Sequence, residues 1–180
     1  MATSAFECPA IHSFPPFFTQ QPTADTWNKQ RQLWCELVLA HSQHHRVFII
    51  DADEVVGKAA PFHNPAIRRS LPRETVVLVL EHLVSALKCG EWENKDRTRC
   101  WVFWRKPDEW ASLIYKWIFD TGRTNTVCTT FEIIHGDESA DESFHELPEP
   151  LLMRALDVLV KQGKAQIFNS SDGNAGVKFI

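Results

Sequence analysis

Residues 70–104 read SLPRETVVLVLEHLVSALKCGEWENKDRTRCWVFW and carry the clearest structural pattern in the chain. From Ser70-Leu71-Pro72 onward, apolar residues recur at helical spacing and predict a helix that ends near Gly90. The apolar face of this helix is formed by Val76, Leu80, Leu83, Val84 and Leu87. Two aromatic-rich runs, 91–93 and 100–104, then flank a polar turn. This order predicts a helix followed by a β-hairpin.

The residues before this stretch predict a helix, a strand and a loop. Asp25 is a suitable cap for a helix that runs to about His44. The apolar face of this helix contains Trp27, Trp34, Leu37, Val38 and His41. Residues 47–50 form a short apolar, strand-like run. Residues 51–65 contain Gly57, Pro61 and Pro65, which break regular structure and predict a loop.

The second half of the chain repeats this order. Its expected elements are a helix from Pro107 to about Gly122, a strand at 126–128, a short helix at 129–135, an acidic loop at 137–149, a longer helix opened by Pro148 and Pro150, and two strands, 165–168 and 177–180, around the turn residues Asp172-Gly173. Leu71-Pro72 and Leu147-Pro148 introduce the longer helix of each half. The chain therefore shows one architecture twice.

A helix-turn-helix followed by a β-hairpin is a winged helix. We therefore predict an α+β protein that consists of two tandem winged-helix domains. The first domain is expected at residues 1–106 and includes an extended arm, residues 1–22, that is rich in proline and phenylalanine. The second domain is expected at residues 107–180.

The composition favours a cytoplasmic protein with a packed core. Hydrophobic residues make up 44% of the 180 residues. No apolar run approaches the roughly 20 residues that span a bilayer, and the first ten residues contain Glu7 and no basic residue, unlike a secretory signal. The five cysteines are odd in number and form no CxxC pair. We therefore expect reduced thiols.

Charge is distributed unevenly between the two halves. Residues 1–106 contain 13 basic and 11 acidic residues, whereas residues 107–180 contain 6 basic and 12 acidic ones. An acidic half repels phosphate backbones and suits a basic protein partner. The acidic run 137–149 is either a solvated loop or a landing site for such a partner.

The sharpest local feature is Phe14-Pro15-Pro16-Phe17-Phe18 in the arm. Paired prolines restrict the chain before docking, and extended proline-rich segments fit aromatic-lined grooves. The expected partner-binding residues are therefore Pro15, Pro16, Phe17 and Phe18. The alternative is that these aromatic rings fold back onto their own domain.

No motif in the sequence supports catalysis. His41 and His45 have the i, i+4 spacing of a metal-binding pair, but a third ligand is not evident and histidines suit a helix C-terminus. Asp51-Ala52-Asp53-Glu54 lacks the glycine and the later glutamate of a calcium loop. Cys128 has no base near it in the sequence. We expect no catalytic residue, no metal and no cofactor.

Winged helices also raise the alternative of a DNA-binding transcription factor. The longer helix of each half would enter the major groove. Neither helix carries a basic stripe, although Lys95, Arg97, Arg99, Arg105 and Lys106 cluster in the first hairpin and the linker. We therefore expect no specific binding of nucleic acid.

Taken together, several segments resemble the small-subunit family of ESCRT-II, a vacuolar protein sorting complex. The matching segments are Phe14-Pro15-Pro16-Phe17-Phe18-Thr19 with Gln21-Pro22, residues 104–110, Leu113-Ile114-Tyr115, Thr121-Gly122 with Thr124-Asn125-Thr126-Val127-Cys128-Thr129, and Gly176-Val177-Lys178-Phe179. Phe18 replaces a tyrosine of some members, and residues 48–60 match the family poorly.

The resemblance implies a non-enzymatic adaptor of two winged helices. It implies that the Pro-Pro-x-aromatic motif, here Pro15, Pro16, Phe17 and Phe18, docks onto two larger ESCRT-II subunits, with two copies of the chain per complex. It further implies that residues 107–180 recruit and activate an ESCRT-III subunit. The expected setting is the sorting of ubiquitinated cargo into multivesicular bodies, by a cytoplasmic protein that is recruited to the endosomal membrane through its complex.

Overall fold

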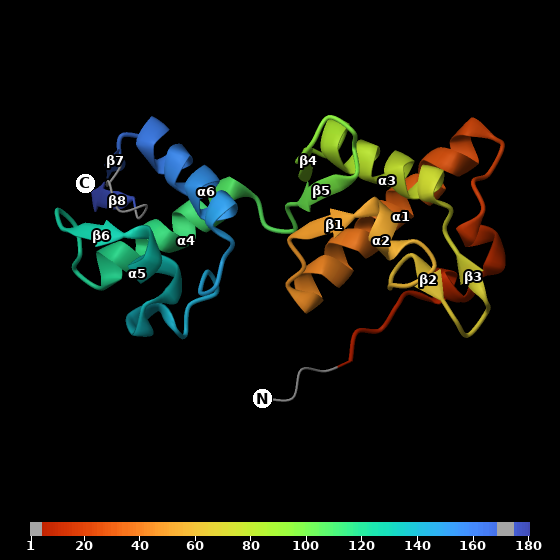
Figure 1. Ribbon diagram of the computed structural model, residues 1–180, viewed down its shortest axis with the longest axis horizontal. Coiled ribbons are helices and arrows are strands. Elements are labelled where there is room, and N and C mark those ends of the chain that lie inside the picture. Colours follow the sequence, from red (N-terminus) through yellow and green to blue (C-terminus); the bar gives the residue numbers. More distant parts are fainter. Residues whose placement is uncertain (1–4, 169–174) are drawn as a thin grey trace. The chain divides into compact units, whose positions relative to one another are not determined.

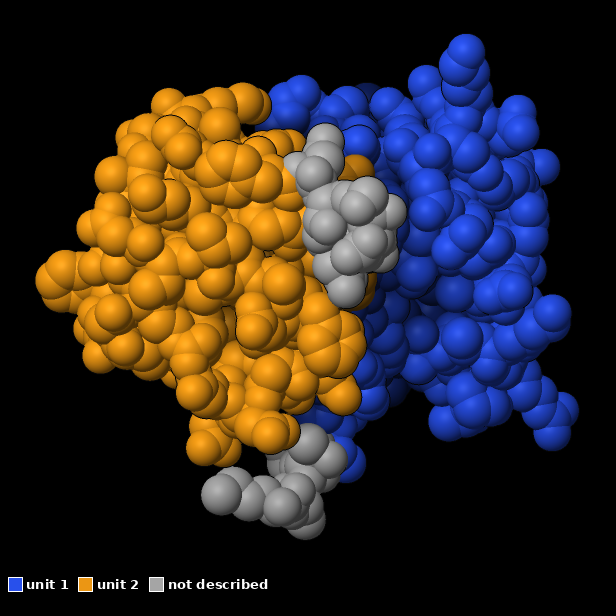
Figure 2. Space-filling view, turned by 60° about the vertical axis from the view of Figure 1, so that its left-hand side comes forward, with its two compact units in different colours: residues 1–104 blue, residues 105–180 orange. Residues whose placement is uncertain are grey.

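The computed structural model of the chain describes residues 5–168 and 175–180. The chain divides into two compact units, Met1–Trp104 and Arg105–Ile180, which Figure 2 shows in different colours. The division falls after Trp104, close to the junction expected near Lys106-Pro107. That each half folds by itself stays a prediction.

The first unit joins three helices to a small antiparallel sheet (Figure 1). Its elements are η1 Ala10–Ser13, η2 Pro15–Phe18, α1 Ala24–His45, β1 Ile49–Asp51, α2 Ala52–Val55, β2 His63–Asn64, β3 Arg69–Ser70, α3 Arg73–Ser85, β4 Gly90–Trp92 and β5 Arg99–Val102. The strand order is β1-β5-β4, and β2 pairs only with β3 within the described chain. The expected long helix and hairpin are α3, β4 and β5.

The core of the first unit lies between α1, α3 and the sheet. Trp34 and Val38 of α1 are fully buried, as are Leu80 and Leu83 of α3 and Val102 of β5. The helix residues are three or four positions apart in the sequence, so they lie on one face of each helix. For this reason the apolar periodicity predicted both helices correctly. Burial of each side chain stabilises the unit by about 1.5–3 kcal/mol.

The prediction of a loop over residues 51–65 is wrong in two places. Asp51 ends β1 and caps α2, because its carboxylate accepts the backbone N–H groups of Asp53 (2.9 Å) and Glu54 (3.3 Å). His63 and Asn64 form β2 and pair with β3. Both elements are too short for a periodic signal, and β2 depends on a partner strand that is distant from it in sequence.

The second unit repeats the element order of the first (Figure 1). Its elements are α4 Pro107–Asp120, β6 Val127–Thr129, α5 Thr130–His135, η3 Asp137–Ser139, α6 Glu149–Lys161, β7 Ala165–Phe168 and β8 Gly176–Phe179. The strand order is β6-β8-β7. The expected turn at Asp172-Gly173 lies outside the described residues.

The core of the second unit lies between α4 and α6, which pack against each other. Trp110, Ile114 and Ile118 of α4 are buried, as are Leu152 and Leu156 of α6. Thr129 caps α5 in a reciprocal capping box with Glu132, which fixes where β6 ends and α5 begins.

Both units contain a helix, a strand, a short helix, a longer helix and a hairpin. In each sheet the last strand lies in the middle, between the first strand and the other hairpin strand. The predicted α+β class is confirmed, and the element order is the one expected of two winged helices. In the described part of the chain, no helix has both the length and the apolar character required to cross a membrane.

Candidate docking site

Residues 10–18 of the arm are compact, so the prediction that the arm is extended is wrong for this part of it. Residues 10–13 and 15–18 form two successive 3-10 turns, and Phe17 N–H donates to the carbonyl of Phe14 (3.0 Å). Pro15 and Pro16 occupy the first positions of the second turn. Proline suits these positions because its fixed φ matches a helical turn and its missing N–H would have no partner there.

Phe17 and Phe18 lie in the core of the first unit. They are 3% and 2% exposed. The ring of Phe17 stacks on Trp34 with centroids 4.3 Å apart, and Phe18 contacts Trp34 edge-on at 5.3 Å. The alternative that these rings fold back onto their own domain is therefore confirmed for both. Partner binding by Pro15, Pro16, Phe17 and Phe18 stays a prediction, and burial restricts the two phenylalanines to an indirect role.

One buried side chain of α1, Gln30, holds the backbone of the arm. Its Nε2 donates to the carbonyls of Phe17 (2.7 Å) and Thr19 (2.9 Å), and its Oε1 accepts the N–H of Gln21 (3.1 Å). Trp34 Nε1 donates to the same Phe17 carbonyl at 3.0 Å. Loss of such a partner leaves buried polar groups unsatisfied, which costs about 1–3 kcal/mol.

A second contact fastens the start of the arm to residues 61–64. His12 is buried, and its Nε2 lies 2.7 Å from the carbonyl of Pro61. Because a carbonyl only accepts, Nε2 carries the proton of the ring. Asn64 Nδ2 donates to the carbonyl of His12 (2.8 Å). The arm is thus fixed at both ends of the two turns.

What the arm presents outward is Phe14 together with Pro15 and Pro16, all exposed. Phe14 is 57% exposed, a large fraction for an aromatic residue between two ordered turns. Beside it a cavity of about 240 Å³ separates the arm from α1. We call this cavity the arm–helix groove; its lining residues are Ile11, Phe14, Pro16, Phe17, Gln21, Thr26, Lys29, Gln30 and Leu33. Leu33 is 39% exposed.

The first unit also contains two buried thiols and a pair of neighbouring histidines. Burial raises the pKa of the Cys35 and Cys100 thiols to about 12, so both stay protonated. His41 and His45 lie together on α1, with ring centroids 4.4 Å apart. Across residues 5–168 and 175–180, no three histidine, cysteine or acidic side chains gather in a way that could hold a metal ion.

In the second unit, the acidic segment 137–149 is anchored by two buried apolar residues, Phe144 and Leu147. Its carboxylates at Asp137, Asp141 and Glu146 are exposed. This unit therefore offers a negatively charged surface, in contrast to the apolar arm–helix groove of the first unit.

Three contributors to the docking site were not found in the sequence: Gln30, Asn64 and Leu33. Gln30 had a usable signal, because it lies between Trp27 and Trp34 on the apolar stripe of α1. A polar residue on such a stripe indicates a buried hydrogen-bond partner. Asn64 had no local signal, since its partner His12 is 52 residues away.

Comparison with known proteins places this fold among vacuolar sorting proteins. The family described as ESCRT-II complex subunit matches residues 11–148. The vacuolar protein-sorting-associated protein 25 of Danio rerio is 41% identical over 98% of this chain and 99% of its own, and that of Dictyostelium discoideum is 38% identical over 100% and 99%.

Solved structures agree with the sequence relatives. The crystal structure of subunit VPS25 of the endosomal trafficking complex ESCRT-II covers 94% of this chain and 97% of its own, with a TM-score of 0.80 and 27% identity. A chain of the crystal structure of the endosomal complex ESCRT-II (VPS22/VPS25/VPS36) gives the same TM-score at 28% identity, over 96% of this chain and 98% of its own. The tandem units, the Pro-Pro-Phe-Phe turn and these full-length matches together establish that the chain belongs to the ESCRT-II complex subunit family.

Proposed function

We propose that this chain is a non-enzymatic adaptor subunit that docks onto two larger subunits of an ESCRT-II complex through its arm. The observation that carries the proposal is the exposure of Phe14, Pro15 and Pro16 on a turn that Gln30 and His12 hold in place. The relative solved as VPS22/VPS25/VPS36 supports an assembly of this kind. Within the Pro-Pro-Phe-Phe motif the two prolines face the partner, whereas Phe17 and Phe18 hold the turn in place.

The energetics favour a surface of this type. Burial of the exposed parts of Phe14 (57%) and Leu33 (39%) against a partner contributes about 1 kcal/mol each, a fraction of the roughly 1.5–3 kcal/mol of a fully exposed side chain. Association also costs translational, rotational and side-chain freedom, which a rigid turn reduces. The arm–helix groove is therefore an apolar centre that acts together with the surrounding surface of the first unit.

The second unit serves a different partner in this proposal. Residues 107–180 recruit and activate an ESCRT-III subunit, supported by their excess of acidic residues, which suits a basic partner helix. Two copies of the chain per complex would present two such units. The complex carries the chain to the endosomal membrane, where ubiquitinated cargo is sorted into multivesicular bodies.

The test compares exposed apolar residues inside and outside the arm–helix groove. Phe14→Ala and Leu33→Ala should each weaken assembly with the co-expressed larger subunits by about 10-fold or more, as measured by isothermal titration calorimetry. The matched controls are Phe119→Ala, whose ring is 68% exposed in the second unit, and Leu78→Ala, whose side chain is 39% exposed like that of Leu33. Equal affinities for the groove variants and their controls would refute docking through the arm.

A further inference from the structure

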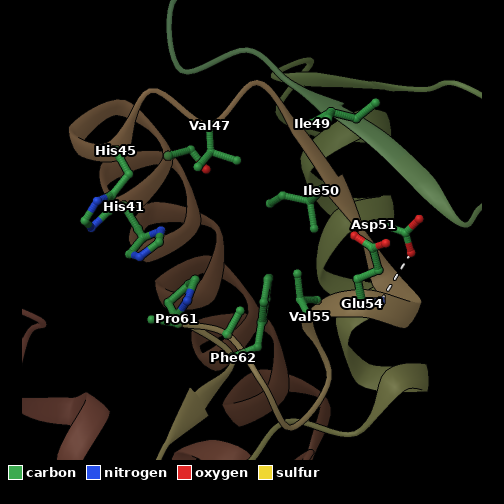
Figure 3. Close-up of a pocket in the computed structure, with 13 residues that line it drawn as sticks. His41, His45, Val47, Ile49, Ile50, Asp51, Glu54, Val55, Pro61 and Phe62 are labelled. Atoms are coloured by element: carbon green, nitrogen blue, oxygen red, sulfur yellow. Dashed lines mark hydrogen bonds between the residues drawn. The ribbon is translucent and has the colours of Figure 1, made fainter.

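A second cavity lies on the first unit, away from the arm–helix groove. It measures about 490 Å³ and separates the C-terminal end of α1 from residues 47–62. Figure 3 shows His41 and His45 on one wall and β1 with Glu54 and Val55 on the other. Most of its surface is apolar, contributed by Val47, Ile49, Ile50, Val55, Pro61 and Phe62. We call this cavity the β1 pocket.

The strand that lines the pocket, β1, has one free edge. It is an outer strand of the sheet β1-β5-β4. Backbone bonds to the β5 side are made at Ala52, whose N–H donates to Thr98 (2.8 Å), and at Phe48, whose carbonyl accepts from Val102 (2.9 Å). Since antiparallel strands alternate their bonding direction at each residue, the N–H and C=O groups of Ile49 and the N–H of Asp51 point away from β5.

The pocket also has a charge preference. Asp51 and the exposed Glu54 lie at the end of β1 and line the cavity. The neighbouring cations are bound elsewhere: Arg99, opposite Asp51 on β5, pairs with Glu93 at 3.0 Å, and Arg73 pairs with Asp53. On the facing wall, burial and the nearby His45 and His44 lower the pKa of His41 to about 4, so this imidazole is neutral near pH 7. A cationic ligand therefore meets carboxylates without a competing positive charge at His41.

We propose that the β1 pocket binds an extended peptide of a partner protein, which adds as a strand to the free edge of β1 and alternates apolar with basic side chains. Strand addition supplies affinity through backbone hydrogen bonds and specificity through alternate side chains. Ile50 is buried on the core side of β1, so apolar peptide side chains on that side enter the cavity. Ile49 and Asp51 alternate with Ile50 along β1 and also line the cavity, so lysine or arginine of the peptide meets the carboxylates of Asp51 and Glu54.

The experiment uses the full chain and three fluorescein-labelled heptapeptides in anisotropy titrations. SKVKVKS has the proposed alternation, SEVEVES reverses the charge, and SKKKVVS keeps the charge without the alternation. SKVKVKS should bind with a Kd at least about 10-fold below both others. Equal binding of the three peptides, or no saturable binding of SKVKVKS, would overturn the proposal.

Two further measurements test the charge and the backbone separately. Glu54→Lys should raise the Kd of SKVKVKS by about 10-fold, whereas Asp96→Lys, the same charge change at the exposed turn of the first hairpin, should leave it within about 2-fold. N-methylation of the central lysine of SKVKVKS removes one peptide N–H and should weaken binding similarly, with no change to the protein. Binding that is insensitive to either change would refute strand addition beside Glu54.

Discussion

The two units share one scaffold but differ in the segment that covers the tryptophan of their first helix. In the first unit Phe17 and Phe18 of the arm pack on Trp34 of α1. In the second unit Phe144, from the acidic segment between α5 and α6, packs edge-on against Trp117 of α4, with ring centroids 5.5 Å apart.

The difference lies in what each covering segment shows to solvent. The arm precedes its helix and leaves Phe14 and two prolines exposed, whereas the segment 137–149 leaves carboxylates exposed. In both units a phenylalanine packs on a tryptophan, but the covering segment of the first unit exposes an apolar surface and that of the second unit an acidic one. The covering segments therefore contribute to stability through their buried phenylalanines, and in our proposal their exposed residues decide which partner each unit suits.

The largest expected effect follows from removing the covering phenylalanines. Phe17→Ala should lower the unfolding free energy of the first unit by about 3–5 kcal/mol, because it leaves a cavity beside Trp34. Phe144→Ala should do the same to the second unit. If the units fold separately, differential scanning calorimetry should show each variant lowering a different transition. A single transition that both variants lower equally would contradict independent domains.

A smaller effect is expected from the hydrogen bonds that only the first unit uses to hold its covering segment. Gln30→Ala should cost about 1–3 kcal/mol in urea denaturation, since the N–H of Gln21 loses its acceptor and the carbonyls of Phe17 and Thr19 each lose one of their donors. It should also weaken assembly with the larger subunits. The control is Gln32→Ala on the same helix, whose side chain makes one surface bond to Glu36. Equal costs for both variants would argue against the role of Gln30.

The cap of the short helix α5 in the second unit can be tested through the pH dependence of stability. The backbone N–H and the hydroxyl of Thr129 lower the pKa of Glu132 in the second unit. A lowered carboxyl pKa contributes stability above the unfolded value of 4.5, and this contribution is lost as the pH falls through the folded pKa. Glu132→Gln should remove that pH dependence. The change should not exceed about 0.5 kcal/mol, because Glu132 is exposed. The measurement is the unfolding free energy between about pH 5 and pH 3, the range around the pKa of an unfolded glutamate. If the wild-type protein loses no more stability than the variant over this range, the role of Glu132 is contradicted.

The weakest interaction is expected with duplex DNA. Arg73, at the start of the longer helix α3, pairs with Asp53, and α6 begins with Glu149. Neither helix presents a basic stripe, so binding to duplex DNA should be negligible near physiological salt in an anisotropy titration. Tight binding with a steep salt dependence would favour the transcription-factor alternative.

The sequence alone determined the order of the elements and the duplication. Apolar periodicity, prolines at helix starts and turn residues are local signals, so α1, α3, α4 and α6 and both hairpins were located within a few residues. It also identified Pro15–Phe18 as a special segment. It missed α2 and the β2–β3 pair, because elements of two to four residues contain only about one period, too little for a pattern to repeat.

Only the tertiary structure decided which side of the arm is buried. Phe14, Phe17 and Phe18 are identical residues within five positions, and their own sequence gives no reason for Phe14 to be exposed and the other two to be buried. Two residues of the next helix, Trp34 and Gln30, decide which rings are buried. Trp34 packs on the ring of Phe17, and Gln30 donates a hydrogen bond to the Phe17 carbonyl. Burial depends on contacts between segments distant in sequence, whereas helix formation depends largely on neighbouring residues.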